Sequence, residues 1–178
     1  MAELSSSPLS RRLARLFNVR PEETPAVMGG LLLFFLLFTG YFMLRPVRET
    51  MGVAGGVDKL QWLFTATFVA TLLAMPLFGW LASRVQRRRI LPWTYGFFVL
   101  NLLAFAAGLL SRPDDPWVGR VFYVWLSVFN MFSISLAWST LADVFASDQA
   151  KRLFALIAGG ASLGGLAGPV LGTLLVAP

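Results

Sequence analysis

The sequence predicts an all-α protein, a polytopic bundle of helices that cross a membrane. Three observations support this prediction: five long stretches without a charged residue, a hydrophobic content of 57%, and basic residues gathered at the ends of the stretches. A transmembrane helix needs about 20 apolar residues, which is close to the length of each stretch. Charged residues make up only 13% of the chain, whereas soluble domains contain roughly 25%.

The five stretches also predict the order of the chain's parts. Residues 1–25 form a basic leader, in which residues 8–19 are either an amphipathic helix on the membrane surface or a disordered segment. A transmembrane domain covers residues 26–178. Its spans are expected at about residues 26–44, 60–81, 90–110, 121–142 and 153–176. A flexible connection at residues 52–56 is expected to follow the first span.

The distribution of basic residues predicts the orientation. Ten of the fifteen Lys and Arg residues lie before the first span, between spans two and three, or before the fifth span. These three segments share one side of the membrane if the spans alternate. Because positive charge accumulates in the cytoplasm, we expect a cytoplasmic N-terminus in the cell's inner membrane.

Composition excludes several kinds of site. The chain has no cysteine and no histidine. Disulfides, thiolate or imidazole metal sites and histidine-dependent catalytic triads are therefore excluded. We expect no catalytic residue, no cofactor, no metal and no enzyme activity. The net charge of +6 comes from basic residues at span ends, so the lipid bilayer is the expected partner and nucleic acid is not.

A basic turn follows the second span. Its sequence is Gly-Trp-Leu-Ala-Ser-Arg-Val-Gln-Arg-Arg-Arg, residues 79–89. The spacing resembles the signature G-x-x-x-D-R-x-G-R-R that lies between helices two and three of the major facilitator superfamily. The matching residues are Gly79, Arg84, Arg87 and Arg88. The resemblance implies a role in gating the cytoplasmic side, although Ser83 replaces the family's acid. An ordinary positive-inside loop is the alternative.

Glycines recur every four residues in the fifth span, at Gly160, Gly164, Gly168 and Gly172. Residues four apart share a helix face, so these glycines form a groove that another helix can approach closely. Pro169 lies beside the groove and can kink the helix. The string also resembles the fifth-helix motif of many major facilitator antiporters.

Charged residues end the first span. Tyr41, Arg45 and Arg48 share one face if the helix continues, and Glu49 follows them, but Pro46 is expected to break the helix locally. Charges at a span end are costly unless they meet water, a partner or a substrate. Either they anchor the helix at the interface or they form a cationic patch that binds an anion.

The segment before the fifth span, Asp-Gln-Ala-Lys-Arg-Leu-Phe, contains Lys151 and Arg152. Together with the end of the first span, it resembles the nucleotide exchange translocases of plastids and intracellular bacterial parasites. That family carries L-R-x-x-K-D at the end of helix one and E-A-K-R-F-Y before helix five. Gln149 replaces the second motif's acid. The resemblance implies an anionic substrate, and its departures favour one other than ATP and ADP.

The fourth span contains three polar residues, Ser127, Asn130 and Ser133. They form hydrogen bonds to neighbouring helices or line a cavity, and we expect Asn130 to line the substrate route. Asp143 lies just past the apolar part of this span, where it pairs with an inner-side arginine or carries a proton.

These resemblances imply a specific architecture: five spans of a six-helix half of the major facilitator type, truncated before a sixth span. The implied function is a secondary transporter that works by alternating access on a small anionic solute. Its missing C-terminal half would be a partner. The alternative is a membrane scaffold or assembly subunit without transport activity. An intramembrane enzyme is a weaker alternative, because no acid pair falls inside a span.

Overall fold

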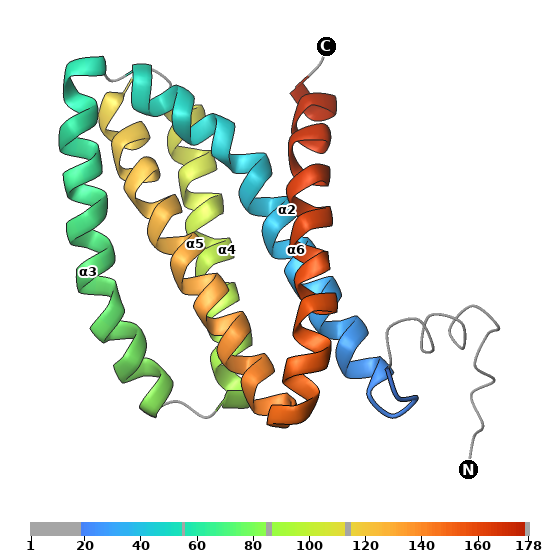
Figure 1. Cartoon of the computed structure of the whole chain (residues 1–178). Helices are drawn as coiled ribbons and strands as arrows, with labels where there is room; N and C mark the ends of the chain where they lie inside the picture. Colours follow the sequence, from blue (N-terminus) through green and yellow to red (C-terminus); the bar gives the residue numbers. More distant parts are fainter. Residues whose placement is uncertain (1–18, 55, 85–86, 113–114, 177–178) are drawn as a thin grey trace. The chain divides into compact units, whose positions relative to one another are not determined.

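The computed structural model describes residues 19–54, 56–84, 87–112 and 115–176. Its helices are α2 (Thr24–Ala54), the short 3-10 helix η1 (Val57–Lys59), α3 (Leu60–Arg84), α4 (Arg87–Ser111), α5 (Pro116–Val144) and α6 (Ser147–Val176) (Figure 1). Within the described residues, five helices are long and apolar enough to cross a membrane, which confirms the predicted fold class. The leader helix expected at residues 8–19 lies outside the described part, apart from its last residue.

The helices are longer than the apolar stretches. Helix α2 continues ten residues past Leu44, and Pro46 lies inside it, so the expected break is wrong. Arginine, glutamate and methionine favour helix, and transmembrane helices tolerate proline. The flexible connection expected at residues 52–56 is therefore helical as far as Ala54. It turns at Gly56, whose φ of +100° suits a residue without a Cβ.

The chain divides into two compact units, which we describe separately. Unit 1 comprises Met1–Gly40 and Ser139–Pro178, and unit 2 comprises Tyr41–Trp138. Helices α2 and α5 therefore contribute residues to both units, whereas α6 belongs to unit 1 and α3 and α4 belong to unit 2.

Unit 2 is held together by aromatic rings from α4 and α5. Phe98 of α4 is buried, and its ring centroid lies 4.8 Å from that of Phe129 and 6.0 Å from that of Trp125. The Phe78 ring of α3 packs edge-on against Phe132 at 4.9 Å. Such edge-to-face pairs add to the gain from burying apolar area. The cluster therefore fixes α3, α4 and α5 against one another and orients the faces of α5.

Unit 1 is built on a close contact between α2 and α6. Leu153 and Ile157 of α6 are fully buried, and Gly160 and Gly164 continue the same face. A Cβ added at Gly160 would collide with the carbonyl oxygen of Leu31. One added at Gly164 would collide with that of Phe35. The two helix backbones thus touch, as small residues at transmembrane interfaces allow.

The remaining residues of the glycine motif lie further along α6. Gly168 is buried, Gly172 is half-buried and Pro169 is exposed. Pro169 lies inside the helix, which runs on to Val176.

Candidate functional site

The arginines at the end of α2 converge on one carboxylate. Arg48 Nη1 lies 3.0 Å from Glu49 Oε1, and Arg45 Nε lies 4.0 Å from the same oxygen. The Arg45 and Glu49 side chains are about half exposed, at 51% and 49%, whereas Arg48 is only 13% exposed. Two guanidinium groups beside one carboxylate leave a net positive charge. Arginine forks of this kind also suit phosphate oxygens.

Arg48 is positioned by Tyr123 of α5. Its guanidinium carbon lies 4.0 Å from the centre of the Tyr123 ring, and its Nε donates to the Tyr123 carbonyl oxygen at 3.3 Å. The ring faces α2 at Gly52, where an added Cβ would lie 2.8 Å from a ring carbon. Glycine at position 52 therefore lets the Tyr123 ring pack against α2 beneath the arginine.

The Tyr123 hydroxyl is one of four buried polar side-chain atoms that lack a hydrogen-bond partner among the described residues, together with those of Thr67, Trp125 and Ser133. Tyr123 is fully buried, yet its hydroxyl has no hydrogen-bond partner among the described residues. Buried polar groups are nearly always paired with protein or water, so an unpaired hydroxyl requires an explanation. It lies on the ring that carries Arg48, the most buried cation of the cluster.

Asn130 and the serines of α5 lie further along the same helix. Asn130 follows Tyr123 by seven residues, so it lies on the same face of α5, about 10 Å further along the helix. Its side chain is half-buried. The Ser127 hydroxyl donates to the Tyr123 carbonyl oxygen at 3.2 Å. Ser133 is buried, and its carbonyl oxygen accepts a hydrogen bond from the Tyr95 hydroxyl of α4 at 3.4 Å. This bond to a neighbouring helix uses the backbone of Ser133.

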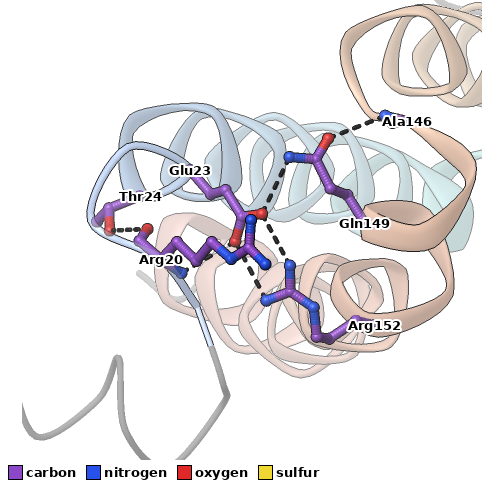
Figure 2. Close-up of polar contacts among 6 residues, drawn as sticks. All are labelled: Arg20, Glu23, Thr24, Ala146, Gln149 and Arg152. Carbon is purple, nitrogen blue, oxygen red and sulfur yellow. Dashed lines mark hydrogen bonds and ion pairs between the residues drawn. The ribbon is translucent and has the colours of Figure 1, made fainter.

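A second polar cluster joins the beginnings of α2 and α6 in unit 1 (Figure 2). Its centre is Glu23, whose side chain is only 3% exposed. Arg152 binds both carboxylate oxygens, with Nη2 2.8 Å from Oε1 and Nη1 3.2 Å from Oε2. Gln149 Nε2 donates to Oε1 at 3.0 Å, and the Arg20 backbone N–H donates to Oε2 at 2.9 Å. The buried charge is therefore paired and hydrogen-bonded, as burial requires.

The same contacts cap the start of α6 and stabilise the turn that precedes α2. Glu23 reaches back three residues to the Arg20 N–H, with Pro21 at the first position of the turn. Gln149 reaches back three residues in the same way, and its Oε1 accepts from the Ala146 N–H at 2.9 Å. Each side chain thus satisfies a backbone donor that a helix start leaves unpaired. Gln149 makes both contacts at once, because its amide oxygen accepts from the Ala146 N–H at the start of α6 and its Nε2 donates to Glu23.

These contacts lower the pKa of Glu23. Hydrogen bonds from Arg152, above all, and from the Arg20 backbone N–H favour the charged carboxylate and outweigh the opposing effect of burial. They lower the pKa from 4.5 to about 2. Glu23 is thus ionised throughout the physiological pH range, so its charge for pairing with Arg152 is retained there.

The other candidate residues fall outside these two clusters. Lys151, Asp143, Gly79 and Arg84 are exposed, and Tyr41 is half-buried beside Phe42. Arg84 is the last residue of α3 and Arg87 the first residue of α4. The side chains of Arg87 and Arg88 lie outside the described part, so the gating role expected for the basic turn remains a prediction.

Neither Glu23 nor Tyr123 was among the candidate residues. Glu23 has a local signal, because Arg-Pro-Glu-Glu at residues 20–23 is a typical helix start, with proline at the first position and acids behind it. Tyr123 has none. It lies inside an apolar stretch, and only the packing of α5 on α2 brings it beneath Arg48.

Comparison with known protein families gives a match for this chain. Residues 14–178 match the family model of the Major Facilitator Superfamily. The chain is 20% identical over 162 residues to "Multidrug resistance protein 3" of Bacillus subtilis (strain 168). That match covers 89% of this chain and 30% of the relative, so the chain spans about a third of the relative's length. No solved structure matches the chain significantly.

Proposed function

Because this chain belongs to the major facilitator superfamily, and hence to a family of membrane transporters, we propose that it is the N-terminal part of an alternating-access secondary transporter for a small anionic solute. A nucleotide or a phosphate ester is the solute class that we favour. The segments that hold most of the basic residues would face the cytoplasm, which places the N-terminus inside and the protein in the inner membrane.

The arrangement of Arg45, Arg48 and Glu49 is the observation that supports an anion most strongly. Glu49 shares its carboxylate between two guanidinium groups. Because the Glu49 and Arg45 side chains are half exposed, an incoming phosphate can reach them and replace the Glu49 carboxylate beside both arginines. Arg48 is already oriented by Tyr123, so little side-chain freedom is lost when it binds an anion.

Tyr123 supplies a neutral hydrogen-bonding group next to this charge, and Asn130 supplies another about 10 Å further along α5. The unpaired hydroxyl of Tyr123 would gain a partner if the ring turns as the helices move. Asn130 shares its helix face, toward the middle of the span. Together with Arg48 they would give an anion both a charged and a neutral contact along the route. Lys151, which is exposed near the start of α6, would meet the anion on the inner side.

We expect Arg48 to be required for transport of the anion. Replacing it with glutamine removes charge-assisted hydrogen bonds, and kcat/KM for uptake should fall about 10- to 100-fold. Arg48→Lys keeps the positive charge but loses the two-pronged guanidinium, so its kcat/KM for uptake should lie between those of the wild type and Arg48→Gln. The measurement is uptake of labelled nucleotides and phosphate esters by the protein expressed from its complete gene.

Arg112→Gln is the matched control, since Arg112 is exposed after the end of α4. It should leave kcat/KM unchanged. Thermal midpoints of all variants separate a loss of binding from a loss of folding, because Arg48 also packs on Tyr123. Normal uptake by a well-folded Arg48→Gln variant would remove Arg48 from the substrate route. An absence of transport by the wild type for every solute tried would favour the scaffold alternative.

A further inference from the structure

Unit 2 contains a groove that the transport proposal does not use. It has a volume of about 630 Å³ and lies between the first turns of α3 and α5. Its walls are largely apolar and include Trp62, Ala66, Trp117 and Val124. The two indoles are strongly exposed, at 73% for Trp62 and 66% for Trp117. This is an open groove on the surface of helices that cross a bilayer.

Two cations line the groove at its outer end. Lys59 ends η1, directly before α3, and Arg120 lies in the first turns of α5. The Arg120 guanidinium is held over the Trp117 ring at 5.0 Å from its centre. Asp58 and Asp115 lie at the same helix ends, but neither is among the residues that line the groove. Among the described residues, the lining therefore combines apolar walls with two positive charges and no negative one.

The groove has the depth of part of one membrane leaflet. Its lining runs from Lys59 to Ala66 on one side and from Trp117 to Trp125 on the other. At 1.5 Å per residue this corresponds to about 10–12 Å. Half of a hydrocarbon core of about 30 Å is about 15 Å. The cations lie at the helix starts, where headgroups lie, and the apolar walls continue toward the chains.

We propose that this groove binds an anionic phospholipid, with its phosphate at Lys59 and Arg120 and an acyl chain along Trp62, Ala66 and Val124. Charge complementarity selects the anionic headgroup. The apolar lining selects a ligand that carries a hydrocarbon chain, which a free phosphate does not. Tryptophan is common at this depth because its ring tolerates both environments.

A neighbouring groove provides the internal comparison. It has a volume of about 370 Å³, lies between α4 and α5, and includes Ala104 and Phe105 in its lining. It shares Trp117 and Val121 with the first groove, but no cation lines it. A lipid that follows apolar shape alone would fill both grooves, whereas one that also requires charge would prefer the first.

Tryptophan fluorescence of the protein expressed from its complete gene tests this proposal, since three indoles line the groove. The protein is reconstituted in phosphatidylcholine with a small fraction of dibrominated phosphatidylglycerol, or with the same fraction of dibrominated phosphatidylcholine. We expect stronger quenching by the anionic lipid, and a relative affinity that falls about fivefold for each cation lost in Lys59→Gln and Arg120→Gln. Ala66→Phe should reduce quenching by blocking the groove.

Ala104→Phe, in the neighbouring groove, is the matched control. The brominated anionic lipid should quench its tryptophan fluorescence as strongly as that of the wild type. Thermal midpoints show whether each variant folds. Equal quenching by the two brominated lipids would overturn the proposal. So would competition by millimolar inorganic phosphate, which would assign the cations to a soluble anion. Loss of quenching in Ala104→Phe as strong as in Ala66→Phe would also contradict it, because selection would then not depend on the two cations.

Discussion

Replacing Gly160 with alanine will destabilise the protein, although alanine favours helix more than glycine does. The new Cβ would collide with the Leu31 carbonyl oxygen of α2. That oxygen belongs to a helix backbone and cannot rotate away, so α2 and α6 must separate. Separation exposes a close contact along both helices, and we expect a loss of about 1–3 kcal/mol in the free energy of unfolding.

Gly159 is the matched control for this change. It precedes Gly160 in the same helix, but nothing lies within 4 Å of a Cβ added there. Gly159→Ala should therefore be as stable as the wild type, or slightly more so. Gly164→Ala should behave like Gly160→Ala, because its Cβ meets the Phe35 carbonyl oxygen. Thermal midpoints in detergent check these expectations, and equal midpoints for Gly159→Ala and Gly160→Ala would contradict the close contact.

Replacing Glu23 with glutamine will also destabilise the protein, because it removes the buried carboxylate that both Nη atoms of Arg152 contact. Breaking a buried pair by removing one member is much more damaging than removing both. Glu22→Gln is the matched control, since Glu22 is the adjacent acid and is exposed. It should unfold at the temperature of the wild type, whereas Glu23→Gln should unfold at a lower temperature.

The pH dependence of this difference has a definite sign. The pKa of Glu23 is about 2 in the folded protein, below its ordinary value of 4.5. The ionised carboxylate therefore stabilises the fold fully above pH 4.5, and this stabilisation is lost as the pH falls toward 2. The midpoint difference between Glu22→Gln and Glu23→Gln should be constant from pH 5 to 8 and shrink below pH 4.5. A difference that persists unchanged to pH 2 would contradict the pairing.

The Glu23 cluster also gives a physical reason for glutamine at position 149. The amide of Gln149 donates to the Glu23 carboxylate while its oxygen accepts from the Ala146 N–H. An ionised glutamate could still accept from Ala146, but it has no hydrogen to donate. It would also place a second negative charge beside Glu23. Glutamine at position 149 is thus the residue that matches an acid at position 23.

Much of the fold could be predicted from the sequence. Apolar stretches predict transmembrane helices because lipid leaves the backbone no other hydrogen-bonding partner. The stretches do not predict where helices end, because helices extend beyond the hydrocarbon into polar sequence. This is why α2 runs to Ala54 and α6 begins at Ser147, outside the apolar residues.

Less of the candidate site could be predicted. Helical spacing predicted that Arg45 and Arg48 share one face of α2. This prediction requires only the geometry of a single helix. The contact of Arg48 with Tyr123 joins residues 75 positions apart. The contact of Arg152 with Glu23 joins residues 129 positions apart. Spacing on one helix carries no information about which helix packs against it, so these partners appear only in the structure.

Whether the protein transports a small anion can be measured directly as exchange in proteoliposomes. Vesicles containing the protein expressed from its complete gene are loaded with unlabelled nucleotide or phosphate ester, and entry of the labelled compound is followed alongside that of a lipophilic cation. We expect that an anion exchanges, that the lipophilic cation does not, and that Arg48→Gln abolishes most of the exchange. Transport of the lipophilic cation with no movement of any anion would contradict it.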